Sequence, residues 1–412
     1  MKIVYWLVIS LYFLLLRGVA FFNPKARKWV EGRKGVFERV EAALKGNQSP
    51  ILWFHAASLG EFEQGRPVME QLKALYPEIK IFLTFFSPSG YEVRKNYEKA
   101  DYIFYLPADS PRNAPKLIAL IKPKAVFFIK YEFWYFYLRE VQKAGIPLIL
   151  FSATFRESQF FFKSYSGMFR KLLRGYSHIF VQNQRSLDLL KNIGIHQSSV
   201  AYDTRFDRVL AGSLEAREIP LAEKFKNKQK LLVIGSCWGR DLDVLLPFLN
   251  EFTKPLKVII APHEIKESTL ERIENALKNS TIRYSQAQLD TVRQYEVLLI
   301  DNVGMLSALY RYGEFAYIGG AFGEGLHNIL EPAVYGVPIF FGSDYKDYPE
   351  AEELIQRRGA YSIRQVEELS RIFQELYENE ELRRTQGENS KKYILEHGGG
   401  TQEIVRYFQT LV

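Results

Sequence analysis

The glycine-rich stretch at residues 319–332 has the residue types of an anion-binding loop. It reads GGAFGEGLHNILEP and follows the apolar run Phe315–Ile318, which predicts a buried strand. Residues 329–335 then predict the start of a helix, whose free N–H groups and positive dipole end favour phosphate. Glu331, inside that helix, could accept the hydroxyls of a ribose. The alternative is a glycine turn with a dipole-stabilised carboxylate, and the spacing matches neither the P-loop nor the dinucleotide fingerprint.

Glu61 is the sharpest candidate for acid–base chemistry in the first half of the chain. It follows a predicted apolar strand at residues 51–56 and a turn that ends in Gly60. A carboxylate there could take a proton from a hydroxyl nucleophile, a role worth ~10²–10⁴-fold in rate. The alternative is a helix-opening glutamate that the dipole stabilises by ~0.3–1 kcal/mol.

Further charged and aromatic residues also follow predicted strands. Glu132 and Trp134 come after the apolar run at residues 125–129. The cations Lys130, Arg156 and Arg205 would suit an acidic sugar or a phosphate substrate. Each of these residues is, taken singly, more common on a solvated surface. Their shared position after strand ends makes them site candidates.

Three strand-end turns in the second half could complete a nucleotide site. Ser236 ends one predicted strand, Pro262 and His263 follow a second, and residues 301–305 follow a third. Together with residues 319–331 they could hold the base, ribose and phosphate of one nucleotide. A Ser-His-Asp hydrolase is disfavoured because the sequence has no G-x-S-x-G elbow.

The composition indicates a globular chain of two domains. The 412 residues exceed one ordinary core, and a hydrophobic content of 47% excludes disorder. A net charge of +8 indicates an acidic partner such as anionic lipid, nucleotide or nucleic acid. The single Cys237 cannot form an intramolecular disulfide, and the six histidines show no metal-ligand spacing. A cytosolic, metal-free catalytic body fits these features.

Alternating strand and helix patterns predict two doubly wound α/β domains with parallel sheets. A charged segment at residues 211–230 predicts a linker between them. Ligands in such folds bind beyond the carboxyl ends of the strands, and two facing domains would place a cleft between those ends. The predicted strands are at residues 51–56, 80–85, 102–106, 125–129, 147–151, 179–182, 231–235, 258–261, 297–300, 315–318 and 339–341.

The N-terminal segment predicts a membrane anchor. Residues 3–16 are apolar, and counting through Arg17 to Phe22 gives about the ~20 residues of a spanning helix. A cleaved signal peptide and a buried core helix are the alternatives. The anchor is favoured because basic residues follow at once and would hold the downstream chain in the cytoplasm. These residues are Lys25, Arg27, Lys28, Arg33 and Lys34.

Several motifs together resemble those of a known family, the Kdo transferases of lipopolysaccharide synthesis, where Kdo is 3-deoxy-D-manno-octulosonic acid. The resemblance spans nearly the whole chain, and the combination of S-x-G-E with H-N-x-L-E-P-A is specific to that family. The matching pieces are HAASLGE at residues 55–61, EFW at 132–134, FD at 206–207, AP at 261–262, DNVG at 301–304, GG at 319–320 and GLHNILEPA at 325–333.

The resemblance implies a GT-B glycosyltransferase with two Rossmann-like domains facing a cleft. It would move Kdo from CMP-Kdo to the 6′-hydroxyl of a lipid A precursor, lipid IVA, at the cytoplasmic face of the inner membrane. It implies no metal, no cofactor and no nucleic-acid partner, and inner-membrane lipid as a contact. The expected parts are an anchor at residues 1–22, an acceptor-binding domain at 35–210 and a CMP-Kdo-binding domain at 228–412, whose last helix could pack back on the first domain.

The resemblance also assigns roles to individual residues. Glu61 would be the general base, and Glu132 and Arg205 would steady the transition state. The residues expected to bind CMP-Kdo are Ser58, Gly60, Ser236, Pro262, His263, Gly304, Met305, Leu306, Gly319, Gly320, His327, Asn328, Ile329, Leu330 and Glu331.

Some positions depart from the family pattern. Lys130 replaces a carboxylate, His263 and Glu264 stand where the family has Arg-His, and Met305 replaces a common glutamate. Two rival functions therefore stay open. One is another GT-B transferase or an epimerase that uses a UDP-sugar, and the other is a non-catalytic, membrane-tethered nucleotide-binding module.

Overall fold

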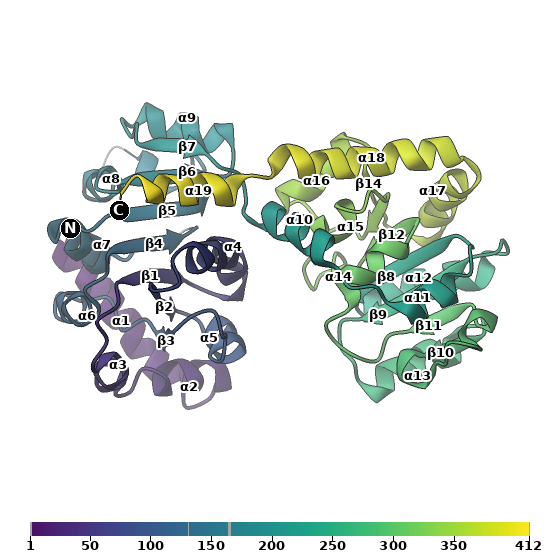
Figure 1. The fold of residues 1–412 in the computed structure, drawn as a ribbon, viewed down its shortest axis with the longest axis horizontal. Coiled ribbons are helices and arrows are strands. Elements are labelled where there is room, and N and C mark those ends of the chain that lie inside the picture. The colour runs from purple at the N-terminus through teal and green to yellow at the C-terminus, as the bar shows by residue number, and fades with distance from the viewer. Residues whose placement is uncertain (1, 131, 164–165, 412) are drawn as a thin grey trace. The chain divides into compact units, whose positions relative to one another are not determined.

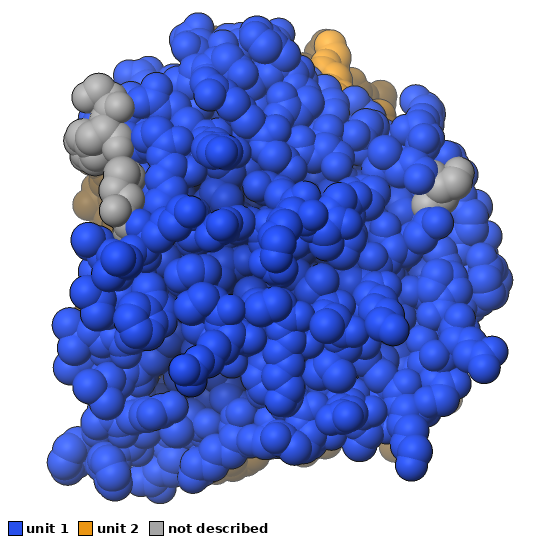
Figure 2. All heavy atoms as spheres, turned by 90° about the vertical axis from the view of Figure 1, so that its left-hand side faces the viewer, with its two compact units in different colours: residues 1–207, 398–412 blue, residues 208–397 orange. Residues whose placement is uncertain are grey.

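The chain folds into two compact units in the computed structural model, which describes residues 2–130, 132–163 and 166–411. Unit 1 comprises the chain up to Asp207 together with the residues from Gly398 onward, and unit 2 is Arg208–His397 (Figure 2). Unit 2 is therefore inserted into the sequence of unit 1. The expected second domain runs from residue 228 to 412. In the structure the residues from Gly398 onward belong to unit 1 instead.

Unit 1 is built, in the described residues, on a seven-stranded parallel sheet in the order β3-β2-β1-β4-β5-β6-β7 (Figure 1). Its central strands are buried along their whole length, as expected when helices cover both faces of a sheet. The strands are β1 Ile51–Ala56, β2 Lys80–Phe85, β3 Tyr102–Tyr105, β4 Ala125–Ile129, β5 Leu148–Ala153, β6 His178–Val181 and β7 Ser198–Val200.

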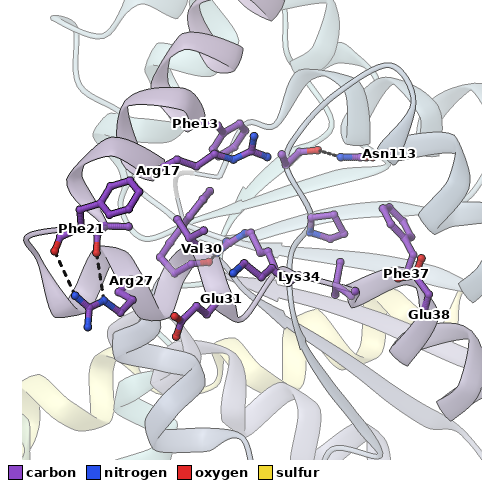
Figure 3. A pocket seen from close by; sticks show the side chains of 17 residues that line it. Phe13, Arg17, Phe21, Arg27, Val30, Glu31, Lys34, Phe37, Glu38 and Asn113 are labelled. Atoms are coloured by element: carbon purple, nitrogen blue, oxygen red, sulfur yellow. Dashed lines mark hydrogen bonds between the residues drawn. The ribbon is translucent and has the colours of Figure 1, made fainter.

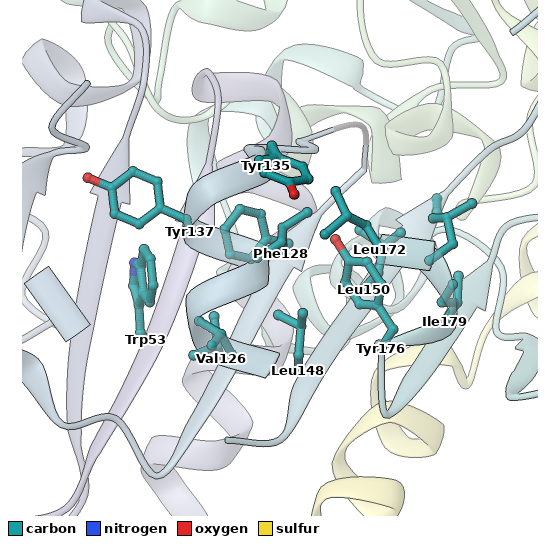
Figure 4. Packing of buried hydrophobic residues seen from close by; sticks show 14 of the residues in the cluster. Trp53, Val126, Phe128, Tyr135, Tyr137, Leu148, Leu150, Leu172, Tyr176 and Ile179 are labelled. Carbon is teal, nitrogen blue, oxygen red and sulfur yellow. The ribbon is translucent and has the colours of Figure 1, made fainter. Parts of the chain in front are cut away.

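Helices of unit 1 pack on this sheet around an aromatic-rich core. Trp53 of β1, Phe128 of β4 and Tyr137 pack edge to face with ring centroids 5.7 Å apart (Figure 4). The helices are α1 Lys2–Val19, α2 Pro24–Glu31, α3 Val36–Leu44, α4 Leu59–Leu75, α5 Pro88–Arg94, α6 Asn113–Ile121, α7 Tyr135–Lys143, α8 Gly167–Arg174, α9 Gln184–Asn192 and α19 Gly400–Gln409.

Unit 2 repeats the same architecture, with a parallel sheet in the order β10-β11-β9-β8-β12-β13-β14 among the described residues. Its strands are β8 Leu231–Cys237, β9 Lys257–Pro262, β10 Thr281–Arg283, β11 Val297–Leu299, β12 Phe315–Ile318, β13 Ile339–Phe341 and β14 Ala360–Ser362. Its helices are α11 Pro220–Lys226, α12 Gly239–Glu251, α13 Glu267–Ala276, α14 Leu306–Leu309, α15 Leu330–Ala333, α16 Pro349–Gln356, α17 Val366–Glu378 and α18 Glu380–His397, while α10 Arg205–Glu215 crosses the boundary between the units.

The predicted fold class is confirmed, because both halves are doubly wound parallel sheets. Three short strands, β7, β10 and β14, lie at sheet edges and are additional to the predicted ones. The predicted linker at residues 211–230 contains the end of α10 and all of α11. Its charged residues lie on the exposed sides of these helices, while Phe225 is fully buried.

Helix α1 is long and apolar enough to cross a membrane, judged by its length and composition alone. One of its faces packs against unit 1. The Tyr5 hydroxyl donates to Asp109 Oδ2 at 2.7 Å, and Phe13 stacks on Trp29 of α2 with ring centroids 5.1 Å apart. The opposite face consists of exposed apolar side chains, which are Ile3, Val4, Leu7, Val8, Leu11, Leu14 and Leu15.

Helix α19 returns to unit 1 and packs against α4 (Figure 1). Phe408 on this helix is fully buried in the same core cluster as β1 and β4. The Asp207 carboxylate accepts hydrogen bonds from the N–H groups of Gly399 and Thr401, the latter at 2.6 Å. The F-D motif thus supplies the cap that begins the last helix.

Candidate functional site

The sheet of unit 1 reverses its strand order between β1 and β4, which are hydrogen-bonded neighbours. Loops leave these two strands in opposite directions, and ligands of doubly wound folds bind at such a point, beyond the carboxyl ends of the strands. The loop after β1 carries Ser58 and Gly60, and the loop after β4 carries Glu132. The topology therefore brings the predicted catalytic loops of unit 1 to the same edge of one sheet.

Glu61 lies in the first turn of α4 and is partly exposed. Ser58, the N-cap residue of that helix, donates its hydroxyl hydrogen bond to Glu61 Oε2. The helix dipole favours a carboxylate at this position, and the serine restricts its orientation. Glu61 is thus a fixed, solvent-accessible carboxylate at the strand ends.

A hydrogen-bonded chain reaches Glu132 from the interior of the sheet. Glu132 Oε2 lies 3.2 Å from His55 Nε2 and accepts a 2.5 Å hydrogen bond from Trp134 Nε1. On its other side, the His55 ring lies 2.9 Å, through Nδ1, from the Thr84 hydroxyl, which accepts a 2.8 Å hydrogen bond from Trp53 Nε1.

The proton of the His55 ring can stand on either nitrogen. On Nε2 it is donated to the Glu132 carboxylate, while Nδ1 accepts from the Thr84 hydroxyl; on Nδ1 it is donated to Thr84, whose hydroxyl then donates to the Phe54 carbonyl oxygen at 3.3 Å. His55 and Thr84 are fully buried, whereas the Glu132 side chain is 16% exposed. The buried residues therefore hold one carboxylate oxygen, and the rest of the carboxylate faces outward.

Arg205 is held by a buried carboxylate that the sequence reasoning missed. Its guanidinium contacts Asp203 Oδ2 through Nη2 at 2.9 Å, and Gln64 and Gln182 donate to the same oxygen. Burial acts to raise the pKa of Asp203, but Arg205 and the hydrogen bonds outweigh it and lower the pKa below its usual value. Asp203 thus stays ionised and fixes the position of the Arg205 cation.

The other two cations proposed from strand-end positions differ in setting. Lys130 has a left-handed backbone with φ of 68° directly after β4. Arg156 is exposed, and its backbone N–H donates to Gln159 Oε1 at 3.1 Å. Trp134, also predicted from its position after β4, contacts Glu132 through the hydrogen bond from its indole Nε1.

In unit 2 the strand order reverses between β8 and β12. Three rings stack beyond the ends of the strands here. The Trp238 and His263 ring centroids lie 4.1 Å apart, and those of His263 and His327 lie 4.6 Å apart. Trp238 Nε1 donates to His327 Nε2 at 3.0 Å. Trp238 was not singled out from the sequence, although it lies two residues after the predicted Gly235-Ser236 turn.

Both histidines of this stack are neutral at physiological pH. Burial and the neighbouring His263 lower the pKa of His327 to about 4, and burial lowers the pKa of His263. A neutral, planar surface of this kind suits stacking on a nucleobase.

Gly319 and Gly320 allow close packing of the protein backbone. A Cβ on Gly319 would lie 2.3 Å from the Ser236 carbonyl oxygen, and Gly320 has a φ of 95°. Their N–H groups donate to the Gly235 carbonyl and to Asp241 Oδ2, both at 2.9 Å. These two N–H groups are therefore engaged within the protein, so an anion would have to be held by other groups.

Glu331 and Asn328 lie where the glycine loop meets α15. This helix spans only Leu330–Ala333, which is shorter than the predicted 329–335. Asn328 Nδ2 donates to Glu331 Oε1 at 3.1 Å. Burial raises the pKa of Glu331, which Asn328 and the charge of Arg208 partly offset.

The remaining predicted donor-site residues also follow strand ends of unit 2. Ser236 has a left-handed φ of 52° near the end of β8, and Pro262 is the last residue of β9. Gly304, with a φ of 97°, leads into Met305, the N-cap of α14, which Leu306 begins. Ile329 and Leu330 are buried. Within the described residues, no three His, Cys, Asp or Glu side chains form a metal-binding group.

Comparison with known proteins relates the sequence to one family. Residues 34–208 match the family described as 3-deoxy-D-manno-octulosonic-acid transferase (kdotransferase). The chain is similar in sequence to Kdo transferases over most of its length. A 3-deoxy-D-manno-octulosonic acid transferase of Chlamydia trachomatis serovar D is 25% identical over 91% of this chain and 89% of its own. One from Aquifex aeolicus is 27% identical over 76% of this chain and 82% of its own.

The fold of the chain is GT-B. MurG of Acinetobacter baumannii is 14% identical and has a TM-score of 0.57 over 88% of this chain and 99% of its own. At this level of identity the likeness concerns the fold alone. The chain therefore combines a GT-B fold with a sequence similar to those of Kdo transferases.

Proposed function

We propose that this protein transfers Kdo from CMP-Kdo to the 6′-hydroxyl of a lipid A precursor, with inversion at the anomeric carbon. The observation that carries the proposal is the position of Glu61, a partly exposed carboxylate at the strand-order reversal of a Kdo transferase domain. Sequence similarity to Kdo transferases supports the donor and the glycolipid acceptor, and the S-x-G-E motif supports the base.

In this mechanism the Glu61 carboxylate removes the proton of the acceptor hydroxyl. The hydroxyl oxygen forms a bond to the anomeric carbon of Kdo, while the bond from that carbon to the phosphate oxygen of CMP breaks. The electron pair of the broken bond leaves with CMP. Arg205, fixed by Asp203 at 2.9 Å, contributes positive charge toward the developing negative charge.

Unit 2 would bind the cytidine monophosphate part of the donor. The neutral stack of Trp238, His263 and His327 offers a flat surface for the base. Glu331 and Asn328 offer an acceptor and a donor for ribose hydroxyls. Since the Gly319 and Gly320 N–H groups are engaged, the phosphate would be held by side chains and by N–H groups elsewhere in the strand-end loops.

The protein would act at the cytoplasmic face of the inner membrane. The exposed apolar face of α1 and the basic α2 support contact with an anionic bilayer.

The experiment is a transfer assay with purified full-length protein, CMP-Kdo and lipid IVA, followed by mass spectrometry of the product. We expect a product heavier by one or more Kdo residues, and calorimetry should show binding of CMP in preference to UDP. Binding of UDP with turnover of a UDP-sugar would replace this proposal with the UDP-sugar enzyme. Nucleotide binding without any turnover would support the non-catalytic module.

A further inference from the structure

A pocket of about 900 Å³ opens in unit 1 between the N-terminal helices and the chain that follows β3 (Figure 3). It is lined by none of the residues of the strand-end loops of Glu61 and Glu132. Its Trp29 packs on Phe86, whose ring centroid lies 4.8 Å from that of Trp134. Its walls come from α1, α2, the start of α3 and residues 107, 108 and 113. The proposed transfer reaction assigns it no role.

The inner wall of the pocket is aromatic and apolar. Phe13 and Trp29 stack with an angle of 24° between their rings, and both are buried. Val30, Phe37 and Pro107 extend the apolar lining. An apolar wall of this kind fits hydrocarbon better than water.

Cationic side chains outnumber anionic ones around the same pocket. Arg17, Arg27, Arg33 and Lys34 line it, against the two carboxylates Glu31 and Glu38. The pocket as a whole is therefore positive and complementary to an anion.

Two of these cations are committed to backbone carbonyl groups. Arg33 donates to the carbonyl oxygens of Leu106 at 2.8 Å, Trp29 at 3.0 Å and Phe86 at 2.7 Å. Burial lowers the pKa of Arg33 to about 9, so it remains a cation at neutral pH. Arg27 donates to the carbonyls of Ala20 and Phe21.

The other two cations, Arg17 and Lys34, are available to a ligand. Neither side chain has a hydrogen bond or ion pair with any residue that the structure describes. Arg17 extends from α1 beside Phe13, and Lys34 lies across the pocket near Val30 (Figure 3). Two unpaired cations above an aromatic wall would hold an anionic group attached to a hydrocarbon.

The exposed apolar face of α1 provides a surface along which the hydrocarbon part of such a ligand could lie. Arg17 lies in the last turn of the same helix that exposes Leu11, Leu14 and Leu15, each more than half exposed. An acyl chain leaving the pocket would run along this face, whereas a free phosphate would leave both the aromatic wall and the helix face uncovered.

We propose that this pocket binds the phosphate headgroup of an anionic glycerophospholipid, with Arg17 and Lys34 as its cationic ligands. Arg33 and Arg27 supply fixed positive charge, and Phe13 and Trp29 pack against the first part of the lipid.

The test is native mass spectrometry of the full-length protein in neutral detergent, titrated with phosphatidylglycerol or with phosphatidylcholine of the same acyl chains. Neutral detergent removes the surface potential of a bilayer, so that binding reports the pocket. We expect one phosphatidylglycerol to bind at least about tenfold more tightly than phosphatidylcholine, and millimolar inorganic phosphate to leave it bound. Equal binding of the two lipids, or displacement by inorganic phosphate, would overturn the proposal.

A matched pair of double variants locates the site. Arg17→Gln with Lys34→Gln removes two charges inside the pocket, and we expect about a tenfold or greater loss of phosphatidylglycerol affinity. Lys25→Gln with Lys28→Gln removes two exposed charges of α2 outside the pocket, and we expect less than about a threefold loss. Equal losses of phosphatidylglycerol affinity in the two double variants would indicate non-specific charge attraction and would contradict the assignment of the site to Arg17 and Lys34. Lys34→Gln alone removes no side-chain contact and still tests the site if the double variant fails to fold.

Discussion

Glu61 and Glu132 occupy different environments at the same edge of one sheet. Among the described residues, Glu61 has a hydrogen bond from Ser58 alone, while Glu132 is held by a chain that begins at buried Trp53. A base must reach its proton, so the less constrained and partly exposed Glu61 fits that role. Glu132, held rigidly, fits a role in positioning or electrostatics.

Replacement of the base should remove turnover without removing donor binding. For Glu61→Gln we expect kcat to fall by about 10²–10⁴-fold, because the amide cannot accept the proton. The KM for CMP-Kdo should change little, since the proposed nucleotide site lies in unit 2. Glu78→Gln, an exposed position beyond the end of α4, is the control and should keep normal turnover. Near-normal kcat in Glu61→Gln would remove this residue from the base role.

The buried histidine behind Glu132 gives a second prediction. His55→Ala should lower kcat by about 10–100-fold, because Glu132 loses a partner that orients it. His55→Gln keeps an N–H donor near the Nε2 position and should recover part of that loss. Steady-state kinetics together with thermal melts of the same variants separates an effect on the orientation of Glu132 from an effect on the stability of the fold. If the kcat values of the two variants simply follow their melting temperatures, His55 acts only on the fold.

Sequence patterns singled out Glu61 and Glu132 together with their near neighbours Ser58 and Trp134, but gave no role to their buried partners from other strands. The S-x-G-E motif is local, so it can be recognised in a single stretch. The contacts of His55 with Thr84, or of Arg205 with Asp203, Gln64 and Gln182, join different strands and loops. Buried polar partners of this kind leave no periodic signal, and only the folded chain brings them together.

Elements were predictable where their hydrophobic pattern is long. The strands at residues 80–85 and 125–129 match β2 and β4 residue for residue. The edge strands β7, β10 and β14 have three residues each and include polar ones, so they lack the wholly apolar run that marked the equally short β11 and β13. In α10 and α11 the charged residues conceal the buried positions, which is why that segment resembles a linker.

Asp109, which accepts a hydrogen bond from Tyr5 of α1, should make the free energy of unfolding depend on pH. Burial raises the pKa of this carboxyl group to about 6, against hydrogen bonds from Tyr5 and from the N–H groups of Phe136 and Tyr137. The folded state therefore favours the protonated form. The stabilising contribution is fully present below about pH 4 and is lost as pH rises through 6, a change on the order of 2–3 kcal/mol.

Asp109→Asn should remove this part of the pH dependence. We expect the variant to be less stable than the wild type at pH 4, because an amide cannot accept all three hydrogen bonds. The difference in unfolding free energy should shrink by on the order of 2–3 kcal/mol between pH 4 and pH 7. Urea unfolding in detergent at several pH values measures it. A constant difference would show that Asp109 does not titrate in this range.

At the scale of the whole molecule, the chain passes from unit 1 to unit 2 after Asp207 and returns at Gly398. The core of unit 1 therefore includes side chains from both ends of the sequence. Phe408 contacts Phe127 of β4 with ring centroids 5.8 Å apart, and Tyr76 at the end of α4 lies 6.0 Å from it.

Truncation of Phe408 should destabilise the unit that contains the N-terminus. For Phe408→Ala we expect a loss of about 3–5 kcal/mol, the usual range for a buried phenylalanine. Hydrogen exchange should show faster exchange in β1, β4 and α4, with unchanged protection in the strands of unit 2. Gln409→Ala, exposed on the same helix, is the control and should leave both units unchanged. Faster exchange spread equally over both units would contradict this division of the chain.

The late return of α19 has a consequence for biosynthesis. A nascent chain that has reached residue 397 can complete unit 2, yet the sheet of unit 1 still lacks the helix that covers Phe127. Unit 1 therefore cannot close its core until α19 has been synthesised, and its apolar surface is exposed to chaperones in the interval. A stop codon placed before α19 would thus destabilise unit 1 while leaving unit 2 intact.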